Sequence, residues 1–148
     1  MRLGFVAAAI LLFSLFPVDI NGQSRPWAPP KTGLWTVTGT DEENTSWTAK
    51  MTLVRAGTRD GRARYRGNFV WEATDGVAAG RETFRGWFDR KTGILRLTSV
   101  SVKSEKGELG SGVYFARAKH KGTMLTAGTW KGKEVVPGKW TAEWRRHK

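Results

Sequence analysis

The sequence predicts an all-β protein, an antiparallel eight-stranded up-and-down meander barrel, with a β-sandwich as the alternative fold. Polar and apolar residues alternate along segment after segment, which is typical of strands with one buried face and one wet face. Turn-forming residues separate these segments at nearly regular spacing, and no stretch of useful length repeats with the period of a helix. Closure into a barrel removes the exposed edges of such a sheet.

A glycine stands two residues before an aromatic residue six times in the chain. Because side chains alternate along a strand, both members of each pair lie on one face. The six pairs begin at Gly33, Gly67, Gly86, Gly112, Gly128 and Gly138. A glycine leaves room for a neighbouring ring and lets the strand bend, as the strongly coiled sheet of a small barrel requires.

The first 24 residues are predicted to be a secretory signal peptide. Arg2 precedes an almost wholly apolar run from Phe5 to Phe16, and small residues lead up to a cleavage point after Ser24. The alternative is a membrane anchor, but the apolar run is too short to span a bilayer comfortably. We therefore expect residues 25–148 to form a single domain that is exported to the periplasm or the extracellular space.

Residues 25–31 contain three prolines and are expected to form an extended lead-in. Eight strand segments follow. They are Gly33–Gly39, Ser46–Arg55, Arg62–Trp71, Gly80–Phe88, Gly93–Val102, Gly112–Lys119, Thr123–Trp130 and Lys139–Arg145. The third shows the alternation best, since its aromatic residues share one face while Arg62, Arg64 and Arg66 share the other.

The pair Gly33-Leu-Trp35 opens the first strand, and Trp130 lies on the penultimate one. In these features, and in its length and strand number, the chain resembles the calycin-type barrels, the group of avidins and lipocalins. The resemblance implies the barrel fold and a structural role for Trp35, packed near Arg145 or Arg146 of the last strand. Val37 stands where we would expect the polar residue that holds biotin in avidins, so the resemblance extends to the barrel and not to that ligand.

The composition points away from catalysis. The chain has no cysteine, which excludes disulfides, thiolate metal sites and cysteine nucleophiles. His120 and His147 have no evident carboxylate partner, and the sequence contains no phosphate loop or metal-binding motif. We therefore predict a protein that is not an enzyme and that uses no cofactor or metal.

In a meander, successive loops alternate between the two ends of the barrel. The loops at 40–45, 72–79, 103–111 and 131–138 share one end, and they are longer and net acidic. We call this end the mouth. The opposite end, which we call the basic end, receives tight, net basic turns and both termini. Residues 41–43 at the mouth are expected to form a solvated acidic loop, since nothing apolar flanks them.

Aromatic residues gather where strands meet the mouth, together with a glutamate that the alternation places on an inner face. The candidate ligand-binding residues are Trp47, Trp71, Phe84, Trp130, Trp140 and Glu82. Aromatic rings with a few polar groups are what a small-molecule site requires. The first functional hypothesis is therefore an exported, non-enzymatic protein that stacks a small apolar or planar ligand on these rings.

The net charge of +12 supports a different hypothesis. A strongly basic exported protein attracts anionic envelope polymers or a membrane surface, whereas we do not expect nucleic acid as its partner. The candidate polyanion-binding residues are Arg55, Arg59, Arg62, Lys119, Lys121, Arg145 and Arg146. In this alternative the barrel is filled, and its basic end docks on the polymer or membrane.

Overall fold

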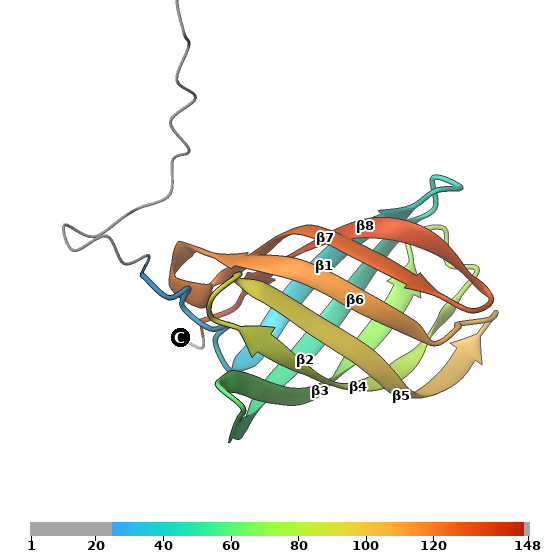
Figure 1. Ribbon diagram of the computed structural model, residues 1–148. Coiled ribbons are helices and arrows are strands. Elements are labelled where there is room, and N and C mark those ends of the chain that lie inside the picture. Colours follow the sequence, from blue (N-terminus) through green and yellow to red (C-terminus); the bar gives the residue numbers. More distant parts are fainter. Residues whose placement is uncertain (1–24, 147–148) are drawn as a thin grey trace, which may run out of the picture.

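A computed structural model describes residues 25–146, which form a closed antiparallel barrel of eight strands in chain order (Figure 1). The strands are β1 (Gly33–Asp41), β2 (Ser46–Arg59), β3 (Arg62–Ala73), β4 (Ala79–Asp89), β5 (Ile94–Lys106), β6 (Gly112–Lys119), β7 (Met124–Gly132) and β8 (Val135–Trp144), with the short 3-10 helix η1 (His120–Gly122) between β6 and β7. Pairing of β8 with β1 closes the sheet, so the barrel is confirmed and the sandwich is not formed. The predicted signal peptide and His147 lie outside the described residues.

Each predicted strand is present, and several are longer than predicted. β2 continues to Arg59 and β5 to Lys106, and β8 begins at Val135 although Pro137 lies within it. Pro137 is tolerated because the register of β7 and β8 shifts between Trp130 and Gly132, which is a bulge of the kind where proline is found. No helix within the described chain is long and apolar enough to cross a membrane.

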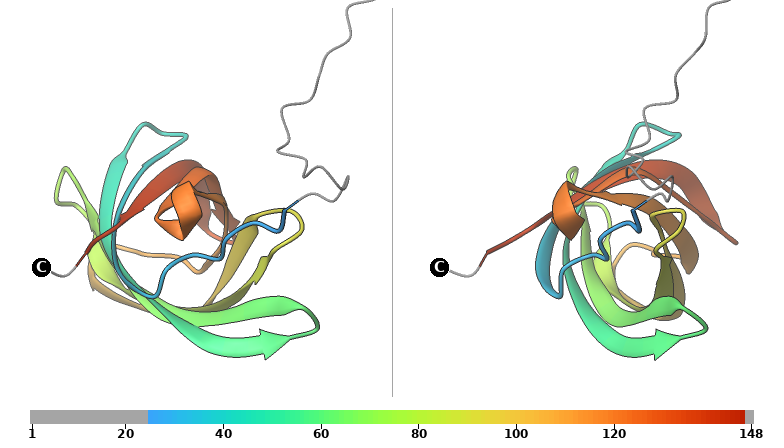
Figure 2. Two further views of the ribbon diagram at one scale, coloured as in Figure 1. Left: turned by 90° about the vertical axis from the view of Figure 1, so that its left-hand side faces the viewer. Right: turned by 60° about the vertical axis from the view of Figure 1, so that its left-hand side comes forward.

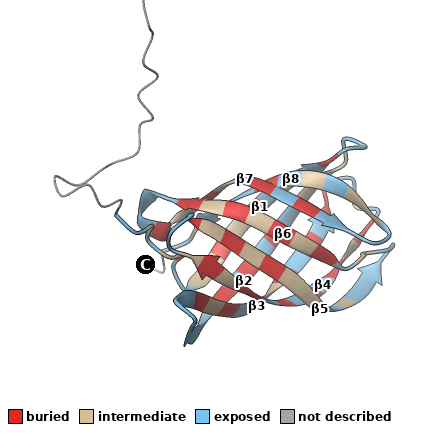
Figure 3. Ribbon diagram, in the orientation of Figure 1, coloured by how far each residue is buried: buried red, intermediate tan, exposed pale blue. Residues whose placement is uncertain are grey.

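The strands alternate between buried and exposed residues along most of their length, so that the inward side chains form one apolar core (Figure 3). Glycines, among them Gly138 of the repeated pairs, let rings lie across neighbouring strands. A Cβ atom on Gly138 would lie 2.2 Å from Cζ2 of Trp130, and one on Gly39 would lie 2.5 Å from Cζ3 of the same ring. The indole of Trp130 therefore lies over β8 and β1 at Gly138 and Gly39, where a residue with a side chain would clash with the ring.

The N-terminal segment crosses the basic end of the barrel (Figure 2). Pro30 is buried there and its carbonyl accepts a 2.8 Å hydrogen bond from the Tyr65 hydroxyl, while the amide of Lys31 donates to the carbonyl of Gly122 at 2.9 Å. The predicted lead-in therefore covers this end.

Trp35 is fully buried near this cover, and its indole donates to the carbonyl of Lys31 at 3.1 Å. Arg145 lies on the outer side of β1, where its Nε donates to Oγ1 of Thr36 at 2.7 Å. Thr36 points outward because it follows the inward-facing Trp35. This differs from the packing of Trp35 near Arg145 that the resemblance to calycin barrels implies.

Candidate ligand cavity at the barrel mouth

A cavity of about 270 Å³ lies inside the mouth of the barrel. The rings of Trp47, Trp71, Tyr114 and Trp130 form much of its wall, and Glu82 lies among them. These residues come from β2, β3, β6, β7 and β4, so the barrel itself and not a single loop builds the site. A site held by paired strands keeps its shape before any ligand arrives.

Glu82 is the charged centre of this cavity. Its side chain is 2% exposed, as the inward phase of β4 predicts. The indole Nε1 of Trp71 and the hydroxyl of Tyr114 both donate to its Oε2, at 2.9 and 2.7 Å. The hydroxyl of Ser99 is hydrogen-bonded to its Oε1. Burial raises the pKa of Glu82, and the hydrogen bonds from Ser99, Tyr114 and Trp71 offset only part of that rise.

Ser99 reaches this carboxylate from the inner face of β5, in the same phase as the buried Leu95 and Leu97, and a bulge follows it. The register between β4 and β5 shifts by one residue, so that Phe84 pairs with Ser99 and Thr83 with Ser101, while Val100 bulges outward and is exposed. The Ser99 hydroxyl also bonds to the backbone of Gly112, the first residue of β6, in place of a backbone group of β5. Its Oγ accepts from the amide of Gly112 at 2.7 Å and lies 2.9 Å from the carbonyl oxygen of the same residue.

The protons of this network can be counted. The Ser99 hydroxyl has one proton but two acceptors in reach, Oε1 of Glu82 and the carbonyl of Gly112. A protonated Glu82 completes the pattern, because it donates to Ser99 and lets Ser99 donate to Gly112 while Oε2 accepts from Trp71 and Tyr114. When Glu82 is ionised, it accepts the hydrogen bond from the Ser99 hydroxyl, and the carbonyl of Gly112 then receives no hydrogen bond from Ser99. The network therefore accommodates both states of the carboxyl group, and burial favours the neutral one.

The aromatic rings around Glu82 are held by hydrogen bonds to the protein. Trp47 Nε1 donates to Oδ2 of Asp41 at 3.1 Å, and Trp130 Nε1 donates to the carbonyl of Val136 at 2.8 Å. Trp71 and Tyr114 use their polar atoms on Glu82. What the four rings present to the cavity is therefore apolar surface and π faces, fixed in position.

Trp71 lies at the centre of this group of rings. Its ring centroid is 6.0 Å from that of Tyr114 in a nearly parallel arrangement, with an angle of 19° between the planes. Trp47 meets it edge-on at 6.5 Å, and Trp130 is tilted against it at 6.2 Å. A change at Trp71 therefore affects all the other rings of the cavity wall.

Asp41 corrects one expectation. It was predicted to lie in a solvated acidic loop, but it is only 9% exposed, while Glu42 and Glu43 are exposed. Its Oδ1 accepts from the backbone amides of Glu43 and Thr45 at 3.0 and 2.8 Å, which organises the turn between β1 and β2. Because its other oxygen holds Trp47, Asp41 also fixes one wall of the cavity.

All the charged side chains that line the cavity are acidic. Asp41, Glu82, Glu108 and Glu134 line it, and no lysine or arginine of the described chain does so. This is notable in a chain with a net charge of +12. The acidic mouth that the loop charges predicted is therefore also the local environment of the cavity.

The structure brings four of the six predicted ligand residues together at the cavity. Trp47, Trp71, Trp130 and Glu82 line it, whereas Phe84 and Trp140 pack in the core beneath it. The Phe84 ring lies 4.7 Å from that of Phe69, and the indole of Trp140 donates to the carbonyl of Thr129 at 3.1 Å.

Sequence reasoning missed Tyr114 as a site residue, although it is the aromatic member of one of the six glycine pairs. That repeat was a signal that could have identified it. Ser99 lies two residues beyond the inward-facing Leu97, so the alternation of β5 was a signal for it as well.

The predicted polyanion-binding residues lie in or beside the turns of the basic end and at the end of β8. Several are already engaged with the protein. Arg55 donates to the carbonyl of Gly57 and to the hydroxyl of Thr58, Arg59 is 3.6 Å from the carboxylate of Asp60, and Arg62 lies over the ring of Trp87. Lys119, Lys121 and Arg146 are exposed.

Comparisons with protein-family models, with curated proteins and with solved structures find no match to this chain. The closed eight-stranded meander is consistent with a calycin-like barrel. Within residues 25–146, no group of three or more histidine, aspartate and glutamate side chains could hold a metal ion.

Proposed function

We propose that this protein is an exported, non-enzymatic binding protein of the calycin type that holds a small planar ligand at the barrel mouth. One observation carries the proposal: fixed aromatic rings enclose a cavity around the buried carboxyl group of Glu82. The polar atoms of these rings already form hydrogen bonds within the protein, so the rings offer a ligand their apolar faces for stacking.

The size and charge of the cavity define the ligand further. Its volume of about 270 Å³ lies at the lower limit of small-molecule sites, so the ligand is small. Four carboxyl groups and no basic side chain of the described residues line it, which disfavours an anionic ligand. Tryptophan and tyrosine faces attract organic cations, and an acidic lining without basic side chains favours a positive charge over a negative one. The ligand therefore carries a cationic or hydrogen-bond-donating group on a planar, largely apolar body.

A matched pair of probes tests this proposal. Benzyltrimethylammonium and benzoate each carry one charge on one aromatic ring, but the charges have opposite sign. We expect the cation to quench tryptophan fluorescence with saturation and benzoate to leave it unchanged. Binding of benzoate as tight as that of the cation, or no saturable binding of either probe, would overturn the proposal.

The alternative function is docking of a filled barrel on an anionic envelope polymer or membrane through the basic end. The tight core around Trp35 and the covering N-terminal segment support it, because they leave that end closed to ligands. Its test is retention on an anionic matrix after replacing Arg55, Arg59, Arg145 and Arg146 with glutamine. Unchanged retention excludes this end as the docking surface.

A further inference from the structure

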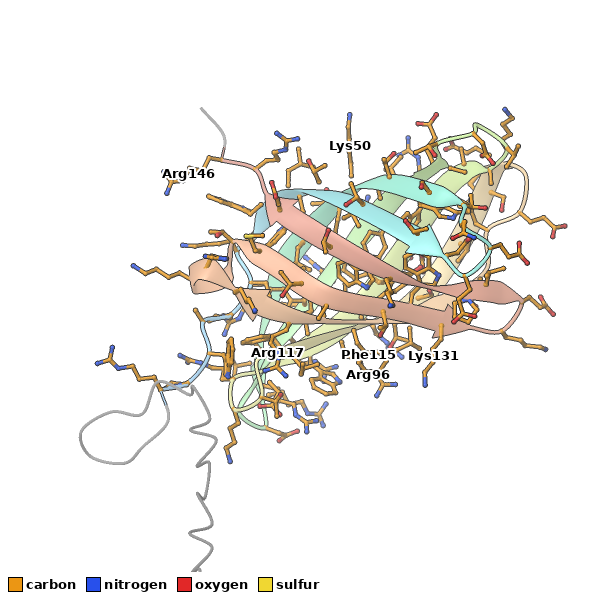
Figure 4. All side chains as sticks on the ribbon, turned by 90° about the horizontal axis from the view of Figure 1, so that it is seen from above. Lys50, Arg96, Phe115, Arg117, Lys131 and Arg146 are labelled. Carbon is orange, nitrogen blue, oxygen red and sulfur yellow. The ribbon has the colours of Figure 1, made fainter. Side chains whose placement is uncertain are left out.

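A second charged surface lies on the outer wall of the barrel, away from the cavity. Arg64, Trp87, Arg96 and Phe115 are direct cross-strand neighbours, one on each of β3, β4, β5 and β6. Further arginines flank this row on the same strands. We call this surface the arginine–aromatic face, and it comprises Arg62, Arg64, Arg66, Arg85, Trp87, Arg96, Phe115 and Arg117. Figure 4 shows Arg96, Phe115 and Arg117 on one side of the barrel and Lys50 on the opposite side.

Aromatic rings hold three of these guanidinium groups in place. Arg62 lies over the ring of Trp87 at 4.3 Å from its centroid, and Arg96 lies over Phe115 at 5.6 Å. Arg117 lies over Trp27 at 5.3 Å and donates to the carbonyl of Thr92 at 3.1 Å. A stacked guanidinium loses less conformational freedom when it binds an anion than a free side chain does. The face is therefore ordered before any partner arrives.

The charges of this face are not neutralised within the described chain. The ion pairs found among residues 25–146 join Arg59 to Asp60 and Arg81 to Glu105, and neither includes an arginine of the face. Asp89 lies at its edge, between β4 and β5, and one of its oxygens accepts from the amide of Lys91. The Nε of Arg96 is buried without a hydrogen-bond partner. The six guanidinium groups of the face therefore have no carboxylate partner within residues 25–146.

The shape of the face distinguishes between classes of polyanion. It extends over four of the eight strands of a closed barrel, so it is strongly convex. A flat membrane can touch such a surface only along a narrow line, whereas a flexible linear polymer can follow it across the strands. Guanidinium groups also cover the rings of Trp87 and Phe115, which obstructs the stacking of nucleic-acid bases on them. What remains accessible is a series of forked donors that suit carboxylate or sulfate groups.

We propose that the arginine–aromatic face binds a linear anionic polysaccharide. Its carboxylate or sulfate groups accept hydrogen bonds from the ordered arginines while its chain crosses β3 to β6. This site is separate from the cavity, and it differs from the basic end except for the shared Arg62. The barrel then has two binding surfaces of opposite charge, one inside the mouth and one on the outer wall.

The test measures binding of a fluorescein-labelled oligogalacturonate by fluorescence anisotropy in low salt. We expect the triple variant R64Q/R96Q/R117Q to bind about tenfold more weakly than the parent, because three charge-assisted contacts are lost. The matched control K50Q/K133Q/K139Q removes the same charge from elsewhere on the barrel and should change the affinity less than about threefold. Thermal unfolding of each variant shows that the barrel is intact.

Four further measurements make the proposal falsifiable. The variant R64K/R96K/R117K keeps the charge but lacks the planar guanidinium groups that stack on the rings. We expect it to bind with intermediate affinity, and full affinity would contradict a role for stacking. The basic-end variant R55Q/R59Q/R146Q should change the affinity as little as the control K50Q/K133Q/K139Q does. An equal loss in all glutamine variants, or tighter binding of oligothymidylate or of phosphatidylglycerol vesicles than of the oligogalacturonate, would overturn the proposal.

Discussion

The indole Nε1 of Trp71 donates a 2.9 Å hydrogen bond to Oε2 of Glu82, a carboxyl group of the neighbouring strand that is only 2% exposed. The Tyr114 hydroxyl donates to the same oxygen, and the Ser99 hydroxyl is bonded to the other. A buried carboxyl group is costly unless such partners satisfy it. In the proposed function this cost has a use, because the ligand that we propose for the mouth would meet a fixed and partly desolvated acid.

Glu82→Gln should leave the fold intact, because an amide reproduces the neutral acid. Its NH₂ group donates to Ser99 and its oxygen accepts from Trp71 and Tyr114. Glu82→Ala leaves two buried donors without an acceptor, and we expect it to cost roughly 2–4 kcal/mol. Chemical denaturation of the two variants at neutral pH checks this. Equal loss in both would mean that the network does not depend on hydrogen bonding.

The stability of the parent protein should fall as pH rises above about 4.3, the ordinary pKa of glutamate. Burial raises the pKa of Glu82 in the folded state, so the folded protein binds this proton more tightly than the unfolded chain does. That stabilisation is fully present below the unfolded pKa and is lost as pH rises through the folded one. Denaturation curves over this range should show a decline in the parent, relative to Glu82→Gln. A parent and variant with parallel curves would contradict it.

Trp35→Ala and Trp140→Ala should both destabilise the barrel by about 3–5 kcal/mol, as for other large aromatic residues in a core. Trp71 borders the cavity, so we expect Trp71→Ala to fall at the lower end of this range, about 3 kcal/mol, and to abolish quenching by benzyltrimethylammonium. Thermal unfolding and fluorescence titration of each variant separate these effects. If Trp71→Ala unfolds the domain as severely as Trp35→Ala and the parent shows no quenching, the mouth is a plug and not a site.

Asp41→Ala should act on the cavity through Trp47. The substitution removes the acceptor for the Trp47 indole and for two amides of the turn between β1 and β2. We expect a loss of about 1–2 kcal/mol in stability and a weaker affinity for the cationic probe. Glu42→Ala is the matched control, since that residue is exposed in the same turn and should change neither quantity.

The periodicity of the sequence predicts most of the fold and part of the site. Period-two alternation placed Glu82 on an inner face and Trp47, Trp71 and Trp130 near the mouth, as the structure has them. Trp140 was placed too near the mouth because the last strand was predicted to begin at Lys139, whereas β8 begins at Val135 and carries Trp140 deeper into the barrel. Ser99 keeps the inward phase of Leu95 and Leu97, whereas the bulge at Val100 shifts the register of the rest of β5, and a change of phase of this kind leaves no trace in the hydrophobic pattern.

The most direct test of a cationic ligand at the mouth follows the indole N–H signals of the eight tryptophans by ¹⁵N–¹H correlation NMR during titration with benzyltrimethylammonium. The cavity geometry predicts that the signals of Trp47, Trp71 and Trp130 shift with one common saturation curve, while those of Trp35 and Trp87 stay in place. Shifts confined to the outer residue Trp87, or uniform small shifts of every indole without saturation, would contradict a ligand site in the mouth of this barrel.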